Sequence, residues 1–484
     1  MVSTQPRVAI IGAGFGGLCV ALRLAARGHH DFVVFEQADD VGGTWYANTY
    51  PGAACDAPSH IYSYSFARTV SWSRRFAPGP EIHAYLRRCV DDAGIADRIR
   101  LSTPVRSAAW VDGRWQIALA DGTTDVADVL VPALGQLSVP KVPGWAQPEA
   151  LAAAGFTGEV VHTARWRDDV DLTGRRVAVV GTGASAVQVV PEIVGDAAHV
   201  TVFQRSAPYV MARPDAEYGA RRRRMPGYTA VARASIWAVF ELFTLSFWRW
   251  PASMAVVRRL FLRQLRSAVP DPALRAVLTP DHEIGCKRIT VSSDWYPALQ
   301  RDDVDLVTDR ISGVAASGIV AGDTTHPADV IVLATGFATT EFCSTVDIRG
   351  RNGLSPAEAW RDGAAAHLGM SVPGFPNLFL VYGPNTNLGA GSIVYMLETQ
   401  TAHILDAVAA ITATGSGLEV RRSAYDGFRR AVRAAEGRTV WAGCRNWYRD
   451  DHGHDIHNWQ WSMWSYRRRA GRMRPADYRA VTVT

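Results

Sequence analysis

Two glycine-rich turns have the residue types and the spacing to bind a phosphate. Residues 12–17 read Gly-Ala-Gly-Phe-Gly-Gly and residues 181–186 read Gly-Thr-Gly-Ala-Ser-Ala, each between a run of β-branched residues and a helical pattern. Glycines there let the backbone approach a pyrophosphate, whose charge is met by free N–H groups and by the positive end of the helix dipole. Because a strand precedes and a helix follows each turn, both turns predict a dinucleotide site of the Rossmann type.

The residue after the second strand of each unit predicts which dinucleotide binds. Glu36 follows the strand pattern 32–35, whereas Arg205 and Ser206 follow the strand pattern 200–203. A carboxylate accepts hydrogen bonds from a free ribose 2′-hydroxyl and repels a 2′-phosphate, which an arginine would bind. The first unit therefore favours FAD or NAD, and the second favours NADPH. A chain that holds both is most simply a flavoprotein that takes hydride from NADPH.

The cysteines indicate where the electrons go. All six are scattered and form no CxxC pair, so a disulfide framework, a zinc site and a redox dithiol are not expected. A disulfide reductase needs a reactive pair, which leaves dioxygen as the expected electron acceptor. The same pattern favours a reducing cytoplasm, and the strand that begins at Val8 leaves no room for a secretory signal.

Two further segments carry a family resemblance. Residues 42–56 match the pattern GGxWxxxxYPGxxxD, and residues 156–168 match FxGxxxHxxxWP followed by Asp168, with Arg167 in place of the proline. Together with the two turns, these segments resemble the flavin-dependent Baeyer-Villiger monooxygenases over most of the chain. Three shorter segments are most similar to the branch that contains the aryl-ketone (acetophenone-type) enzymes: residues 285–288, 382–389 and 441–448.

The resemblance implies that Arg288 acts beside the flavin and that Asp56 is the carboxylate that holds it. In the family, reduced flavin and dioxygen give a C4a-peroxyflavin that must stay anionic to attack a ketone, and the Criegee adduct that follows is again an anion. An arginine, whose pKa lies above about 12, keeps its positive charge without giving the peroxide a proton. The implied product is an ester or a lactone.

The motifs and the resemblance together predict the cofactor contacts. The expected FAD contacts are Gly12, Gly14, Phe15, Gly17, Glu36, Gly43, Thr44, Trp45, Asp56, Tyr62 and Asn387. The expected NADPH contacts are Gly181, Thr182, Gly183, Ser185, Ala186, Gln188, Arg205, Ser206, Lys287, Thr335 and Gly336. Lys287 would be a second cation for the NADPH phosphate, with a plain surface role as the alternative.

The segment 156–168 predicts a hinge at the start of the second unit. His162 could be a general base, but the resemblance implies that this position acts through domain movement rather than proton transfer. The residues of the family pattern that we assign to this linker are Phe156, Gly158, His162 and Trp166.

Two features near the end of the chain have a plainer alternative. The helical pattern 392–410 follows the glycine-rich segment 383–391 and could turn the positive end of its dipole toward the flavin, or it could be an ordinary loop-to-helix junction. His452, His454 and His457 suggest a metal by type, but they lie in a polar loop, and we expect no metal there.

The composition is that of a globular protein with a small-molecule site. The chain has 484 residues, 48% of them hydrophobic, and a net charge of +5 that is spread along it, so a nucleic-acid partner is not expected. The longest apolar stretch, 236–248, is interrupted by Glu241 and is too short to span a bilayer. We expect a buried helix there, with a membrane-surface or substrate-access element as the alternative.

These patterns predict an α/β fold with two Rossmann-like dinucleotide-binding domains and an inserted helical subdomain. Residues 1–140 and 328–484 would form the FAD-binding domain, and residues 141–216 and 284–327 the NADPH-binding domain. Residues 217–283 would form the helical insertion.

We therefore predict a monooxygenase that uses FAD, NADPH and dioxygen to insert oxygen next to a ketone carbonyl. One alternative is a flavin monooxygenase that oxidises nitrogen or sulfur, which needs a protonated peroxide and gains less from Arg288. An alternative of another class is a non-catalytic dinucleotide-binding redox sensor, or an NADPH oxidase that releases hydrogen peroxide. The sequence leaves open the ketone and the oligomeric state, monomer or homodimer.

Overall fold

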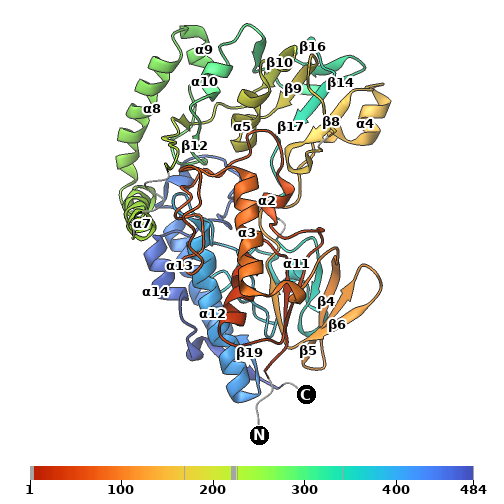
Figure 1. The fold of residues 1–484 in the computed structure, drawn as a ribbon, viewed down its shortest axis with the longest axis vertical. Helices are drawn as coiled ribbons and strands as arrows, with labels where there is room; N and C mark the ends of the chain where they lie inside the picture. The colour runs from red at the N-terminus through yellow and green to blue at the C-terminus, as the bar shows by residue number, and fades with distance from the viewer. Residues whose placement is uncertain (1–4, 168, 220–224, 226, 341, 483–484) are drawn as a thin grey trace.

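Two parallel sheets, one behind each glycine-rich turn, organise the molecule (Figure 1). The computed structural model describes residues 5–482 except 168, 220–224, 226 and 341, so Asp168 lies outside the described residues. Figure 1 shows the second unit at the top, the first unit with both chain ends at the bottom, and the helices of the insertion along the left edge. The predicted α/β class with two Rossmann-like units is confirmed.

The first sheet is parallel and has the strand order β3-β2-β1-β7. Every residue of β1, β2 and β7 is buried, as expected for strands that are covered on both faces. The helix α1 follows the first turn and packs against α12, which returns to this unit from late in the chain. The elements are β1 (Val8–Ile11), α1 (Phe15–Ala26), β2 (Phe32–Phe35), β3 (Ile99–Arg100), β7 (Val129–Pro132) and α12 (Ile393–Thr414).

The second sheet is also parallel, with the order β13-β10-β9-β17-β8, and α5 follows its turn. Its last strand in sequence, β17, pairs with β9 and β8. The predicted return to the first domain at residue 328 is therefore too early, because the chain first completes this strand. The elements are β8 (Glu159–His162), β9 (Arg176–Val180), α5 (Ala184–Ile193), β10 (His199–Phe203), β13 (Val304–Val307) and β17 (Val330–Leu333).

Smaller sheets and helices flank the two units. A four-stranded sheet contains β4 (Val105–Val111), β5 (Arg114–Leu119), β6 (Thr124–Ala127) and β18 (Asp347–Arg349), and a three-stranded one contains β14 (Ile311–Ala315), β15 (Gly318–Ala321) and β16 (Thr324–Pro327). A last pair is β19 (Gly417–Val420) with β20 (Tyr478–Val481). The other α-helices outside the insertion are α2 (Thr44–Ala47), α3 (Gly79–Ala93), α4 (Pro148–Ala153), α10 (Trp295–Ala298), α11 (Pro356–Ala359), α13 (Arg422–Glu436) and α14 (Met463–Ala470). Short 3-10 turns are η1 (Ala96–Arg98), η2 (Gly144–Ala146), η3 (Thr163–Arg165), η4 (Pro251–Ser253), η5 (Arg351–Gly353), η6 (Val440–Gly443) and η7 (Pro475–Asp477).

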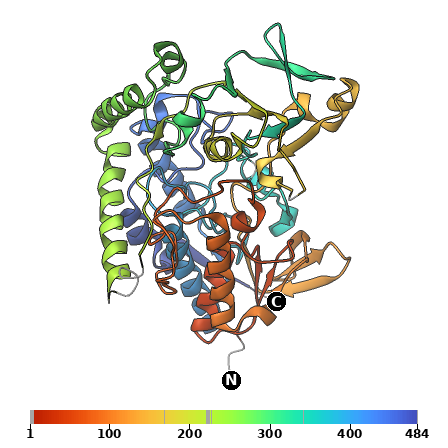
Figure 2. The same cartoon turned by 45° about the horizontal axis from the view of Figure 1, so that its top comes forward.

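The helical insertion leaves and rejoins the second unit at one place. The strands β11 (Val210–Met211) and β12 (Thr290–Val291) pair in parallel and close its base. Between them lie α7 (Tyr228–Trp248), α8 (Met254–Ala268) and α9 (Pro272–Val277). Figure 2 shows α7 and α8 along the outer edge of the molecule.

The prediction of a buried helix at 236–248 is wrong. α7 begins earlier, at Tyr228, and only Thr244 and Phe247 of its 21 residues are buried. The prediction failed because apolar residues lie all around the helix, so that Ala238, Val239 and Leu242 of the predicted stretch face outward. Among the described residues, α7 is the one helix long and apolar enough to cross a membrane by length and composition alone.

Two chain segments cross side by side between the units. The N–H of Lys141 donates to the carbonyl of Gly336 at 2.8 Å, and the N–H of Ala338 donates to the carbonyl of Val139 at 2.9 Å. The hydroxyl of Thr335 donates to the carbonyl of Lys141 at 2.6 Å. Thr335 and Gly336, two predicted NADPH contacts, therefore lie in this double linker.

Candidate active site

The first glycine turn has no room for side chains at its closest approaches. Gly12 has φ +103°, and a Cβ there would lie 2.6 Å from the carbonyl oxygen of Ala133. A Cβ on Gly17 would lie 1.9 Å from the carbonyl oxygen of Gly12. Gly43 packs directly on the turn, since a Cβ added there would lie 2.9 Å from the Cα of Gly14. The turn and the N-terminus of α1 thus form the close-fitting cradle that a pyrophosphate requires.

Glu36 lies beside this turn as a buried acceptor. Its side chain, in a residue that is 6% exposed, accepts hydrogen bonds from the N–H of Ala13 at 2.6 Å and of Ala38 at 3.0 Å. These contacts fix the carboxylate at the end of β2, where a ribose hydroxyl would reach it. The geometry fits a dinucleotide that has no 2′-phosphate, such as FAD.

An aromatic wall continues from the first turn. Phe15, the first residue of α1, packs edge to face on Tyr62 with ring centroids 5.0 Å apart. The indole N–H of Trp45 donates to the hydroxyl of Tyr62 at 3.1 Å, and Thr44 begins the short helix α2 beside it. Four predicted FAD contacts are therefore placed together next to the turn.

The second turn has the same backbone but different chemistry. Gly181 has φ +114°, and a Cβ there would lie 2.5 Å from the carbonyl oxygen of Ala334. Where the first turn has Gly17, this one has the fully buried Ala186. The hydroxyl of Thr182 donates to the carbonyl of Ser206 at 3.1 Å, which holds the residues after β10 against the turn. Gly183 is the N-cap of α5.

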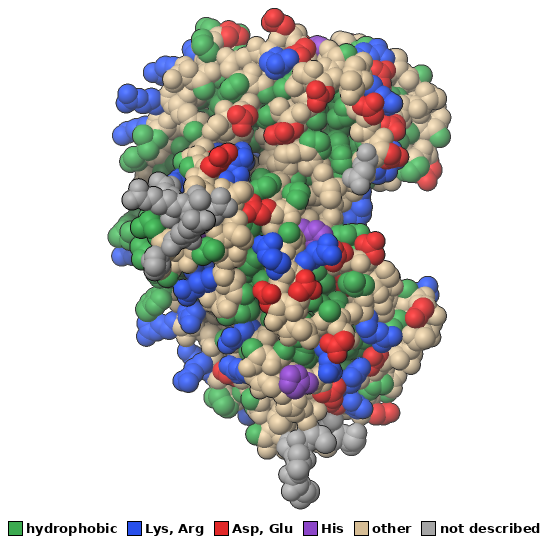
Figure 3. Space-filling view, in the orientation of Figure 1, with side chains coloured by type: hydrophobic (Ala, Val, Ile, Leu, Met, Phe, Trp, Pro, Cys, Tyr) green, Lys and Arg blue, Asp and Glu red, His purple; other side chains and the backbone are tan. Residues whose placement is uncertain are grey.

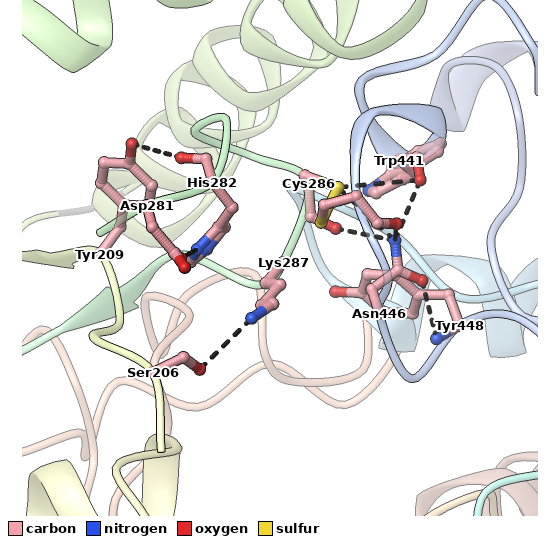
Figure 4. The surroundings of a disulfide bond; sticks show 10 residues. Ser206, Tyr209, Asp281, His282, Cys286, Lys287, Trp441, Asn446 and Tyr448 are labelled. Atoms are coloured by element: carbon pink, nitrogen blue, oxygen red, sulfur yellow. Dashed lines mark hydrogen bonds and ion pairs between the residues drawn. A yellow bond between two sulfur atoms is a disulfide. The ribbon is translucent and has the colours of Figure 1, made fainter. Parts of the chain in front are cut away.

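Two cations lie next to each other beside this second turn. The ammonium group of Lys287 donates to the hydroxyl of Ser206 at 3.3 Å, and Figure 4 shows its side chain extended toward that serine. Burial lowers the pKa of Lys287, and the positive charge of the exposed Arg205 lowers it further. Two neighbouring positive charges favour an anion between them, so the site fits the 2′-phosphate of NADPH.

Gln188 connects the two units instead of pointing into open space. Its carbonyl accepts from the hydroxyl of Tyr50 at 2.8 Å, and its amide donates to the carbonyl of Ala54 at 2.9 Å. Gly52 packs on the same helix, because a Cβ there would lie 2.7 Å from the carbonyl oxygen of Gln188. The segment 42–56 therefore touches the first turn and α5, the helix that follows the second turn. Direct contact of Gln188 with NADPH stays a prediction, as it does for Ser185.

Arg288 and Asp56 are in contact, as the resemblance implied. The Nε and Nη2 atoms of Arg288 donate to one carboxylate oxygen of Asp56 at 2.8 and 2.5 Å. The negative charge of Asp56 raises the pKa of Arg288 above its ordinary value, so the guanidinium is charged at every physiological pH. The arginine side chain is 40% exposed. Within the described part of the chain, Nη1 has no hydrogen-bond partner, which leaves it to donate to a ligand.

Two tyrosines that the sequence did not single out lie close to this pair. Burial raises the pKa of Tyr382 to about 12 although the charge of Arg288 opposes it, and burial also raises the pKa of Tyr448. Both are therefore neutral donors. Tyr382 has a left-handed backbone with φ +61°, and its hydroxyl donates to the amide oxygen of Asn387 at 2.9 Å. The available signal in the sequence was its position at the start of the segment 382–389, which the family resemblance singled out. Its left-handed backbone agrees with a functional site.

The linker residues lie where the chain enters the second unit, and their role as a hinge stays a prediction. His162 ends β8, and its Nδ1 accepts from the N–H of Ala164 at 3.1 Å. Burial lowers its pKa, so the ring is neutral, and it contacts Phe337 of the double linker at 6.2 Å between centroids. Gly158 packs tightly on Phe156, and Trp166 packs on the core of the second unit.

The expectation that no cysteines pair is wrong for Cys286 and Cys444, which form a disulfide bond. They are 158 residues apart, so no local spacing could reveal them. Figure 4 shows Cys286 turned toward the loop of Trp441 while the next residue, Lys287, points the other way. The amide of Asn446 donates to the carbonyls of Cys286 at 3.1 Å and Trp441 at 3.0 Å. The loop thus fixes the chain immediately before Arg288.

The helix and the histidines singled out near the end of the chain are both present in the structure, and a role of the helix dipole toward the flavin stays a prediction. Ser392 caps α12 by accepting from the N–H of Val394 at 3.3 Å, so the predicted helix is present. The ring of His457 bonds to Gln136 at 3.0 Å, whereas His454 bonds to Arg433. In the described residues, no group of three metal-binding side chains comes together.

The fold and the site define a protein class with two dinucleotide-binding units and a fixed arginine between them. A family model for an NAD(P)-binding Rossmann-like domain matches residues 10–75. The chain is 42% identical to a Baeyer-Villiger monooxygenase of Streptomyces coelicolor over 491 residues, which covers 99% of this chain and 93% of that protein.

Solved structures agree with this similarity. An oxidised steroid monooxygenase bound to NADP matches with a TM-score of 0.86 and 31% identity, over 99% of this chain and 100% of that one. A complex of OTEMO with FAD and NADP matches with a TM-score of 0.87 and 25% identity, over 99% and 100% of the two chains. The chain belongs to the Baeyer-Villiger monooxygenase family.

Proposed function

We propose that this chain is an FAD-containing, NADPH-dependent monooxygenase that converts a ketone to an ester or lactone. One ketone, dioxygen, NADPH and a proton give one ester, water and NADP⁺. The first turn with Glu36 holds FAD, and the second turn with Arg205, Ser206 and Lys287 holds NADPH. Bound FAD, once reduced by NADPH, supplies the electrons that activate dioxygen.

The observation that carries this proposal is the contact between Arg288 and Asp56. Asp56 accepts hydrogen bonds from the Nε and Nη2 atoms of the guanidinium and so fixes the plane of that group. The Nη1 atom is left to donate to the oxygen that becomes negative as the ketone carbonyl is attacked. A preorganised donor of this kind acts on the developing charge, where it lowers the barrier most.

The neutral tyrosines support the same chemistry. Because Tyr382 and Tyr448 keep their protons, they add no negative charge that would repel an oxyanion near Arg288. Oxidation of nitrogen or sulfur, the rival chemistry, needs a protonated peroxide and gains less from a permanent cation at this position.

The finer assignments are part of the proposal. A substrate from the aryl-ketone class rests on the segments 285–288, 382–389 and 441–448. A cytoplasmic location rests on the absence of a CxxC pair, although the disulfide of Cys286 and Cys444 weighs against a strongly reducing compartment.

The test is turnover with labelled dioxygen. Purified protein with NADPH and a panel of aryl, cyclic and long-chain ketones should give an ester that carries one labelled oxygen atom per NADPH consumed. Consumption of NADPH with hydrogen peroxide as the only product would indicate an oxidase and contradict the proposal. Sulfide oxidation with no ester from any ketone would favour the rival monooxygenase.

A further inference from the structure

The helix α7 has an inverted distribution of polarity. Its solvent-facing side carries no charged residue, and Val239 and Leu242 in its middle are 64% and 67% exposed. The one hydroxyl on this side, that of Ser235, donates to the carbonyl of Val231 within the helix at 2.6 Å. The exposed residues of this side are Ala230, Val231, Ala234, Ser235, Ala238, Val239 and Leu242.

The two charged residues of α7 point toward the protein. The guanidinium of Arg233 donates to the carbonyls of His60 at 2.9 Å and Ser63 at 2.7 Å. The carboxylate of Glu241 accepts from the N–H of Trp464 at 3.3 Å. A surface helix of a water-soluble protein shows the opposite arrangement, with polar residues outside. The outer side of α7 is therefore suited to an apolar environment.

The neighbouring helix extends this apolar surface and adds positive charge. Leu260 of α8 is 57% exposed, and exposed Val256 lies one turn before it. Exposed tryptophans lie at Trp250, in the turn between the helices, and at Trp464. We call the outer side of α7 together with these residues and the exposed arginines of α8 the α7–α8 face. Its exposed arginines are Arg249, which follows α7, and Arg259, Arg263 and Arg266 of α8.

Charge on this face has one sign. In residues 227–268, all of which are described, the sole carboxylate is the inward Glu241, whereas the exposed arginines remain outside. Figure 3 shows hydrophobic and basic side chains gathered along the left margin, where Figure 1 places α7 and α8. Apolar residues to insert, arginines to meet phosphates and tryptophans at the rim are the features of a helix that lies in a lipid interface.

The helix α7 lies flat against the rest of the protein, so in this structure it cannot cross a bilayer. Its inner side contacts the body from Tyr228, edge to face with His60 at 5.5 Å between ring centroids, to Phe247, stacked on Trp441 at 5.6 Å. Arg233 and Glu241 tie it further to the protein. Only its outer side is free to enter a lipid layer.

We propose that the α7–α8 face binds the surface of an anionic membrane, with α7 parallel to the bilayer plane. The inner side of α7 borders the chain that leads to Arg288, since a Cβ on Gly285 would lie 3.4 Å from the Phe247 ring. A membrane on the outer side would thus lie next to the site. The proposal does not rest on the proposed function, because vesicle binding needs neither NADPH nor a ketone.

The test is sedimentation of the flavin-loaded full chain with vesicles. We expect binding to phosphatidylcholine vesicles that contain about one third phosphatidylglycerol, and binding roughly tenfold weaker to phosphatidylcholine alone or in high salt. The variant Val239→Glu/Leu242→Glu should lose at least roughly tenfold of the binding, because it places two carboxylates where lipid would lie.

A matched control is Val111→Glu/Val126→Glu, which adds the same charges at exposed valines of the sheet β4–β6, on the other side of the molecule in Figure 1. It should bind vesicles like the wild type. Equal flavin content and melting temperature in all variants show that each is folded. Wild-type protein that binds anionic vesicles no better than the Val239→Glu/Leu242→Glu variant would overturn the proposal. A wild-type dimer that this variant dissociates, with no vesicle binding, would also overturn it and assign the face to a second copy.

Discussion

The two glycine turns share one backbone and differ in what surrounds it. Beside the first turn, Glu36 is buried and bound by two backbone N–H groups, and Gly17 lets α1 approach so closely that no Cβ fits. Beside the second turn, Arg205 is exposed, Lys287 has a single serine partner, and Ala186 replaces the third glycine. We call the first site closed and the second open because the residue expected at the ribose, Glu36 or Arg205, is buried in the first and exposed in the second. We infer that the first retains its dinucleotide and the second exchanges it at each turnover.

The largest expected effect comes from exchanging the last residue of the two turns, Gly17 and Ala186. Gly17→Ala would place a Cβ 1.9 Å from the carbonyl oxygen of Gly12, so α1 must shift away from the turn. We expect nearly complete loss of bound flavin, measured from the absorbance of the purified protein. The matched variant Ala186→Gly should keep its flavin, because it only removes a methyl group from the other turn. Equal flavin content in both variants would contradict the proposed difference between the two turns.

A smaller effect is expected at the open site. Arg205→Ala removes one of the two cations beside Ser206, and loss of a charge-assisted phosphate contact costs about 1.5–3 kcal/mol. The KM for NADPH should therefore rise roughly 10- to 100-fold, while the KM for NADH and for the ketone changes little. Steady-state kinetics with both nucleotides measures this. An unchanged preference for NADPH would show that Arg205 does not read the phosphate.

The smallest expected effect is a loss of folding stability at acidic pH in the core of the first unit. His403 of α12 is buried, and burial lowers its pKa to about 4. Its ring bonds to the carbonyl of Ala470 at 3.1 Å and to the hydroxyl of Tyr478 at 2.9 Å, both compatible with the neutral form. Because the folded pKa lies below the unfolded one, this stability is complete above pH of about 6.5 and is lost as the pH falls toward about 4.

The comparison is made between wild type and His403→Gln, which can keep both hydrogen bonds and does not titrate. From about pH 7 to about pH 5 the wild type should lose roughly 2 kcal/mol more stability than the variant. Thermal midpoints at the two pH values measure the difference. Parallel losses in both proteins would show that His403 does not contribute to acid sensitivity.

Local spacing was enough to predict most of the site. The two turns, Glu36 and Arg205 follow from short motifs in which strand, turn and helix are consecutive. The pairing of Arg288 with Asp56 needed the family resemblance, because 232 residues separate them. The roles of these residues in catalysis and cofactor binding stay predictions.

What the sequence did not predict depends on orientation and on distant contacts. The apolar pattern of α7 continues around the helix, so composition could not tell which side faces solvent. The Cys286–Cys444 bond joins segments that only the fold brings together. The strand β17 was assigned to the wrong domain because a short buried strand reads the same in either parallel sheet.

The most direct measurement of the central claim is the ratio of ester formed to NADPH consumed in Arg288→Ala. Ester formation should fall on the order of 100- to 1,000-fold, because a preorganised donor to the developing oxyanion is lost. Reduction of the flavin by NADPH should stay within a fewfold of the wild type, with the electrons appearing as hydrogen peroxide. Ester formation near the wild-type rate in this variant would contradict the account.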